Sequence, residues 1–175
     1  MKFIHTADWQ IGMRSAHVGA AADRVRAERL AAAQRVVDAV NDHQAAFVVV
    51  TGDTFEDNAV DRRLVQKVGD VLAGCRAPVY LIPGNHDPYV PGSVWTHPVW
   101  ESHDNLHVLD AAEPVVVPEG RLFPCPLFEK YSPNDPTTWI DARDIDFVCI
   151  GLADVTVQGV PVSVPDFPIP RDAAA

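Results

Sequence analysis

Cysteine is scarce in this sequence of 175 residues, and long apolar runs are absent from it. The three cysteines, Cys75, Cys125 and Cys149, lie far apart in the chain, so neither a disulfide framework nor a zinc cluster is expected. Free thiols are typical of a reducing compartment, which favours a cytoplasmic location. No run approaches the roughly 18 apolar residues that a membrane span needs. The N-terminus also lacks the apolar core of a signal peptide. We therefore expect no association with a membrane.

Basic residues are few as well. Lys and Arg total 14 against 24 Asp and Glu, which gives a formal net charge of −10. Such a chain is not expected to bind nucleic acid through a generally basic surface. Bound metal ions reverse the sign of the field locally, so phosphate esters remain accessible as substrates. The hydrophobic content of 47% is enough for one core, and we expect a single domain over residues 1–175.

The first half of the chain alternates between apolar runs and helical periodicity. Short β-branched or apolar runs predict strands over residues 2–6, 46–51 and 78–82. Apolar residues at helical spacing predict helices over residues 23–43 and 64–72. This alternation is typical of parallel βαβ units and indicates an α/β fold.

The second half contains most of the prolines and reads as short strands joined by loops. Strands are predicted over residues 106–109, 114–117, 121–123 and 147–153. Trp95 and Trp100 lie in the loop region before them and have two interpretations. They stack on a nucleobase, or they pin a long loop to the domain.

Polar side chains follow each of the first three predicted strands. Asp8 and Gln10 follow the first strand, Asp53 follows the second, and Asn85 and His86 follow the third. Each alone has an ordinary explanation as a turn or helix-capping residue. Since the carboxyl ends of parallel strands meet at one edge of a sheet, we expect these residues to lie together. Oxygen donors with one imidazole suit Mn²⁺, Mg²⁺, Fe²⁺ or Zn²⁺, so the pattern predicts a metal centre.

Three sequence strings carry a resemblance to a known family. Asp8-Trp9-Gln10, the run from Gly52 to Asn58, and Gly84-Asn85-His86-Asp87 resemble the first three motifs of the calcineurin-like metallophosphoesterases. The fuller strings from His5 to Gly12 and from Pro83 to Pro88 resemble the branch of DNA double-strand-break repair exonucleases of the SbcD type. The resemblance implies an αββα sandwich, in which helices flank two mixed β-sheets and two divalent metal ions bind at the strand ends.

The resemblance also implies a role for each site residue. Asp8 and Gln10 would hold the first metal, Asp53 would bridge both metals, Asn85 would hold the second, and His86 would face the scissile phosphate as a donor or acid. Mn²⁺ is the first choice of metal, with Mg²⁺, Fe²⁺ and Zn²⁺ as alternatives. The implied function is metal-dependent hydrolysis of phosphodiester bonds in DNA, by an exonuclease subunit that partners an SMC-like ATPase.

The sequence departs from the family pattern in three places. Gln10 stands where the first motif commonly has His. Asp154 follows the strand that resembles the one delivering a His in the fourth motif, and it either ligates metal or caps a loop. The final Gly-His-x-His motif does not occur before Ala175. We therefore expect a truncated C-terminus and an incomplete second sheet. Its open edge would favour a homo-oligomer.

These departures keep other functions open. With fewer ligands, the chain alone is expected to bind metal weakly and to cleave DNA poorly or not at all. One alternative is a catalytically impaired protein that uses the fold for binding or as a scaffold. Another is a phosphoesterase for small molecules, because a fold does not determine the substrate.

Overall fold

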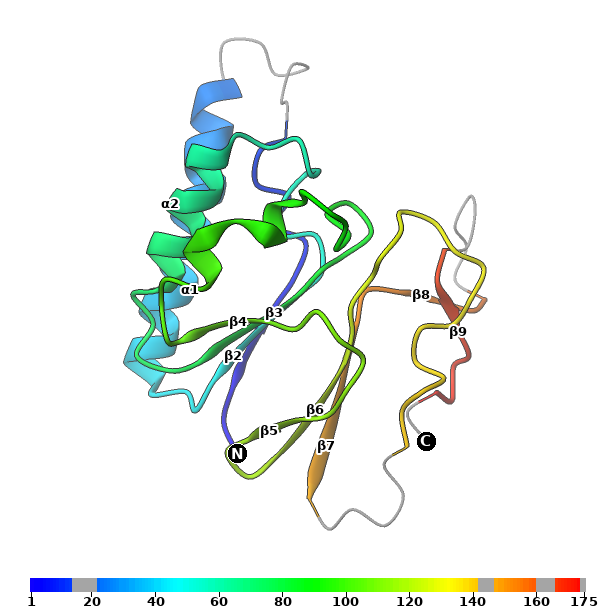
Figure 1. Cartoon of the computed structure of the whole chain (residues 1–175). Coiled ribbons are helices and arrows are strands. Elements are labelled where there is room, and N and C mark those ends of the chain that lie inside the picture. The colour runs from blue at the N-terminus through cyan, green and yellow to red at the C-terminus, as the bar shows by residue number, and fades with distance from the viewer. Residues whose placement is uncertain (14–21, 142–146, 160–165, 174–175) are drawn as a thin grey trace.

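A computed structural model of the protein describes residues 1–13, 22–141, 147–159 and 166–173. Figure 1 shows two β-sheets packed against each other, with the long helices beside the first sheet. The first sheet has four parallel strands in the order β1 (Ile4–Thr6), β2 (Val48–Thr51), β3 (Val79–Ile82) and β4 (Leu106–Val108).

Helix α1 (Ala22–His43) lies between β1 and β2 in the chain, and helix α2 (Arg62–Leu72) lies between β2 and β3. Asp61 caps α2, because its carboxylate accepts a hydrogen bond from the backbone N–H of Arg63 at 2.7 Å. Two short 3₁₀ helices, η2 (Val94–Thr96) and η3 (Pro98–Trp100), precede β4. The strand–helix alternation predicted from the sequence is confirmed here.

The second sheet consists of β5 (Val115–Val117), β6 (Gly120–Cys125) and β7 (Val148–Ala153). Strand β5 pairs antiparallel with β6, and β7 pairs parallel with β6. A separate two-stranded sheet pairs β8 (Thr156–Val157) with β9 (Pro168–Ile169).

The predicted α/β sandwich is confirmed, with two differences in detail. The second sheet is mixed, whereas the first is parallel throughout. Among the described residues, the helices lie beside the first sheet, and no helix covers the outer face of the second (Figure 1). Part of that outer face is covered by Trp139, whose ring lies 5.8 Å from the ring of Phe123 between centroids.

Two apolar layers form the core, and β2 contributes to both. Val48 and Val50 pack in the layer that contains α1 and α2. Phe47 and Val49 pack in the layer between the two sheets, together with residues such as Leu122 and Leu152. Side chains alternate between the faces of a strand, so a strand buried on both sides is apolar at every position.

The two tryptophans with alternative interpretations belong to the helical layer. Trp95 is 3% exposed and Trp100 is 5% exposed, and their ring centroids lie 5.5 Å apart. Of the two interpretations, stacking on a base is therefore wrong, and the tryptophans pin the η2–η3 segment to the domain. The three cysteines are free. None of the described helices is long and apolar enough to cross a membrane.

Candidate metal centre

Two carboxylates from different sheets meet at the carboxyl ends of their strands. Asp53 lies two residues after β2 and is 5% exposed, while Asp154 directly follows β7. A Cβ built at Gly84 would lie 2.5 Å from Oδ1 of Asp53 and 2.6 Å from Oδ2 of Asp154, so the two carboxylates lie side by side. The structure therefore brings a predicted site residue of the first sheet into contact with one of the second.

Two glycines leave the room that this contact needs. A Cβ on Gly84 would lie 2.3 Å from the backbone N of Asp53 and 2.6 Å from Oδ2 of Asp154. A Cβ on Gly52 would lie 2.6 Å from Cβ of Asp154, and its φ of +77° also favours glycine. Any other residue at these positions would push the carboxylates apart.

The electrostatics of the pair are unfavourable without a cation. Burial, together with the nearby charges of Asp53 and Asp8, raises the pKa of Asp154 to about 6. Burial also raises the pKa of Asp53, while the backbone N–H of His86 and the charge on its ring oppose the shift. A divalent cation between the carboxylates would favour their ionised forms.

His86 lies against this pair with its ring held from one side. Its backbone N–H donates to Oδ1 of Asp53 at 2.9 Å, and its Nε2 lies 3.9 Å from Oδ2 of the same residue. Nδ1 lies 3.0 Å from the carbonyl oxygen of Glu56. Because a carbonyl only accepts, Nδ1 carries the proton and donates, which leaves Nε2 available on the side of Asp53.

Asn85 is joined to the pair through its backbone. Its N–H donates to Oδ2 of Asp154 at 2.9 Å, and its side-chain amide donates to Oδ2 of Asp166 at 3.3 Å. Asp166 precedes β9 and belongs to none of the sequence motifs. No local signal in the sequence could have indicated this contact, since the two residues are far apart in the chain.

The residues that follow β1 run along the residues that follow β2. The backbone N–H of Asp8 donates to the carbonyl of Gly52 at 3.4 Å, and that of Gln10 donates to the carbonyl of Asp53 at 2.8 Å. The side chain of Asp8 is exposed and close enough to raise the pKa of both Asp53 and Asp154. The φ angles of Asp8, Gln10 and Asp53 are +55°, +46° and +49°. Positive φ is uncommon outside glycine, and such strain clusters at functional sites.

Asp87 ties the loops after β2 and β3 together, a role that the sequence did not indicate although Asp87 ends the third motif. The side chain is fully buried, and its two oxygens accept from the backbone N–H groups of Phe55 and Gly84, each at 2.8 Å. The indole N–H of Trp95 donates to its backbone carbonyl. Burial raises the pKa of Asp87 to about 7, although the two N–H donors oppose the shift.

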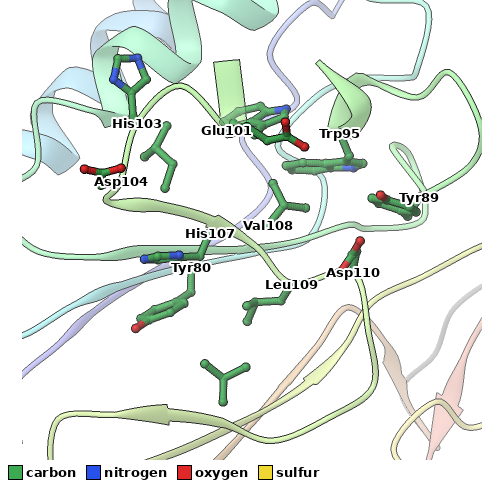
Figure 2. Close-up of a pocket in the computed structure, with 13 residues that line it drawn as sticks. Tyr80, Tyr89, Trp95, Glu101, His103, Asp104, His107, Val108, Leu109 and Asp110 are labelled. Carbon is green, nitrogen blue, oxygen red and sulfur yellow. The ribbon is translucent and has the colours of Figure 1, made fainter. Parts of the chain in front are cut away.

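Two hollows lie near opposite edges of the first sheet, one beside β1 and the other beside β4. A hollow of about 390 Å³ has Asp8 and Asp154 among its lining residues, so it borders the carboxylate pair. A hollow of about 510 Å³ lies along β4, as Figure 2 shows, with Tyr89 and Asp110 in its lining. It contains none of the predicted site residues.

The donor set fits hard divalent cations. Asp8, Asp53 and Asp154 offer carboxylates, and Asn85 and Gln10 offer amide oxygens. Within the described part of the chain, no group of three or more His, Cys, Asp and Glu side chains is close enough to hold a metal ion. The fit therefore rests on the buried Asp53, on the half-buried Asp154 beside it and on the oxygen chemistry around them.

A sequence model of the calcineurin-like phosphoesterases matches residues 1–160. The chain belongs to this family. Members of the calcineurin-like phosphoesterase family depend on metal ions and typically bind two of them. The resemblance that the three motifs carry is therefore confirmed at the level of the family. No curated protein is similar enough to the chain to count as a match.

The raised pKa values predict how stability depends on pH. Above about pH 4 the unfolded chain ionises Asp87 and Asp154, whereas the folded chain keeps their protons up to about pH 7 and about pH 6. The folded state therefore binds more protons in this window. We expect the free energy of unfolding of metal-free protein to fall as pH rises from 5 to 8. Urea unfolding in chelator at several pH values measures it, and Asp154→Asn should flatten the lower part of the curve. A free energy of unfolding that rises across this window would contradict the prediction.

Proposed function

We propose that the chain is a metal-dependent phosphodiesterase of the DNA exonuclease type. The observation that carries the proposal is the contact between Asp53 and Asp154, with His86 beside it, at the joined strand ends of two sheets. In the proposed centre, Asp8, Gln10 and Asp53 hold one divalent ion, and Asp53, Asn85 and Asp154 hold the other. Mn²⁺ is the proposed metal.

Each group in the centre has a defined part in the hydrolysis. Metal ions held by these residues would supply Lewis acidity, which polarises a phosphate and lowers the pKa of a metal-bound water. The hydrogen bond from Nδ1 of His86 to the carbonyl of Glu56 fixes the imidazole ring, so that Nε2 is the nitrogen that faces substrate. In its protonated form, Nε2 donates to a phosphate oxygen. When the P–O bond to the leaving group breaks, Nε2 gives its proton to that leaving oxygen.

Aromatic side chains near the centre support a nucleic-acid substrate. Phe128 is 52% exposed and Tyr131 is 69% exposed. Nζ of Lys130 lies 5.8 Å from the ring centroid of Tyr131. Exposed aromatic rings beside a cation are typical of surfaces that stack single-stranded bases. Isolated aromatic residues in a Pro-rich segment have no periodicity, so no sequence pattern singles them out.

The backbone of this aromatic segment is fixed against the third motif. The N–H of Leu127 donates to the carbonyl of Pro83 at 3.2 Å, and the carbonyl of Leu127 accepts from the N–H of Tyr89 at 2.8 Å. These two bonds lie on either side of the turn that carries Asn85 and His86. The ring of Phe128 in turn lies 6.4 Å from the ring of Tyr89 between centroids. A base stacked on Phe128 would therefore lie on the segment that is joined to both ends of the turn carrying Asn85 and His86.

The choice of branch and the ATPase partner rest on the motifs. The strings from His5 to Gly12 and from Pro83 to Pro88 support the double-strand-break repair branch, with an SMC-like ATPase as the partner and DNA as the substrate. Association into a homo-oligomer belongs to the same proposal. Gln10 in the first motif favours the second candidate, a metallophosphoesterase fold that binds its ligand without cleaving it.

Loss of His86 should remove the proton donor. We expect His86→Ala to lower kcat on bis-p-nitrophenyl phosphate in Mn²⁺ by about a hundredfold, the usual effect of removing a positioned acid or donor. The control is His43→Ala at the exposed end of α1, which should cleave like the wild type. Equal turnover in His86→Ala and wild type would remove His86 from the mechanism. Wild-type protein that binds Mn²⁺ without cleaving any phosphodiester would favour the second candidate.

Phe128 provides the test of the substrate. We expect Phe128→Ala to raise KM for a single-stranded oligonucleotide about tenfold, the effect of losing one stacked base. Phe147→Ala is the matched control, because Phe147 is also exposed but lies before β7, at the end of that strand remote from Asp154. An unchanged KM in Phe128→Ala, or an equal rise in both variants, would contradict the stacking role. Cleavage of small phosphodiesters with none of DNA would indicate a small-molecule phosphoesterase.

A further inference from the structure

Asp166 lies at the metal centre although no motif includes it. Its Oδ2 accepts a hydrogen bond from the side-chain amide of Asn85 at 3.3 Å. The described residues around it, from Asp166 to β9, come from the end of the chain, whereas Asn85 follows β3. The contact thus joins the third motif to a segment that none of the sequence motifs includes.

The carboxylate of Asp166 is itself held in place. Its Oδ1 accepts from the backbone N–H of Ser132 at 2.8 Å, and its backbone carbonyl accepts from the N–H of Thr156 at 3.2 Å. The N–H of Phe167 donates to the carbonyl of Ser132 at 2.9 Å. Ser132 is therefore hydrogen-bonded both to the side chain of Asp166 and to the backbone of the next residue. One carboxylate oxygen is therefore fixed by the backbone, and the other is directed to Asn85.

The chemistry of the two side chains determines which end of the amide faces which way. A carboxylate only accepts hydrogen bonds, whereas an amide has a donor nitrogen and an acceptor oxygen. Asp166 can therefore bind only the nitrogen of Asn85. The amide oxygen is directed elsewhere, and oxygen is the end that a hard divalent cation requires. An Asn85 turned the other way would present N–H groups to the cation.

We propose that Asp166 is a positioning residue that holds the side-chain oxygen of Asn85 toward the metal centre. This inference rests on the proposed function, because it assumes that Asn85 is a metal ligand. Hydrogen bonds from outside the ligand shell commonly orient metal ligands, and their loss typically weakens metal binding by about 10- to 100-fold.

Substitution Asp166→Asn tests the inference without changing the shape of the side chain. Only one oxygen then remains for two donors, the N–H of Ser132 and the amide of Asn85. We expect the oxygen to stay with the backbone N–H and the new amide nitrogen to turn Asn85 over. The dissociation constant for Mn²⁺, measured by calorimetry, should rise at least about tenfold.

The double variant Asp166→Asn with Asn85→Asp provides the rescue. It exchanges donor and acceptor between the two positions and keeps the net charge of the wild type. An oxygen again faces the centre, so the Mn²⁺ affinity should return to within about threefold of the wild-type value. The control for lost charge is Asp61→Asn, at the exposed N-cap of α2, which should bind Mn²⁺ like the wild type.

A second readout uses metal-free protein. In ¹H–¹⁵N spectra, the side-chain amide peaks of Asn85 should move in Asp166→Asn and stay in place in Asp61→Asn. Unmoved peaks, wild-type Mn²⁺ affinity in Asp166→Asn, or a double variant as weak as the single one would overturn the inference. Wild-type protein without Mn²⁺ affinity would instead contradict the proposed function, while the amide peaks still show whether Asp166 holds Asn85.

Discussion

Two carboxylates, the buried Asp53 and the half-buried Asp154, lie side by side beyond the ends of their strands, and the candidate site depends on that proximity. It exists because the two sheets pack face to face through an apolar layer that includes Val49 and Leu152. Each of these residues lies in the strand that carries one of the two carboxylates. Packing between the sheets thus sets the geometry of the charges, and burial then makes their repulsion costly.

Backbone donors reduce that cost but do not remove it. Asp53 accepts from the N–H of His86, and Asp154 accepts from the N–H of Asn85, both at 2.9 Å. These bonds come from the turn after β3, which Asp87 fixes through the N–H groups of Phe55 and Gly84. Neutral donors of this kind hold the carboxylates in position, whereas full ionisation of both requires a positive charge.

The sequence predicted site residues after the parallel strands and, through the family resemblance, offered Asp154 after β7, but it did not indicate Asp166. Strand order along the chain was enough to place Asp8, Asp53 and Asn85 after parallel strands. The positions of Asp154 and Asp166 relative to them depend on how the second sheet and the last segment pack, which no local pattern encodes. Trp95 was ambiguous for a related reason. Only its burial in the folded chain distinguishes a ring that pins a loop from a ring that stacks on a base.

Mn²⁺ binding to Asp154→Asn tests most directly whether the two sheets jointly hold a divalent cation. Calorimetric titration should give an affinity at least about tenfold weaker than that of the wild type, because an amide replaces one carboxylate of the pair. Asp104→Asn removes the same charge from the hollow along β4 and should bind Mn²⁺ like the wild type. Equal Mn²⁺ affinity in Asp154→Asn and wild type would show that the carboxylate of the second sheet takes no part in a metal centre.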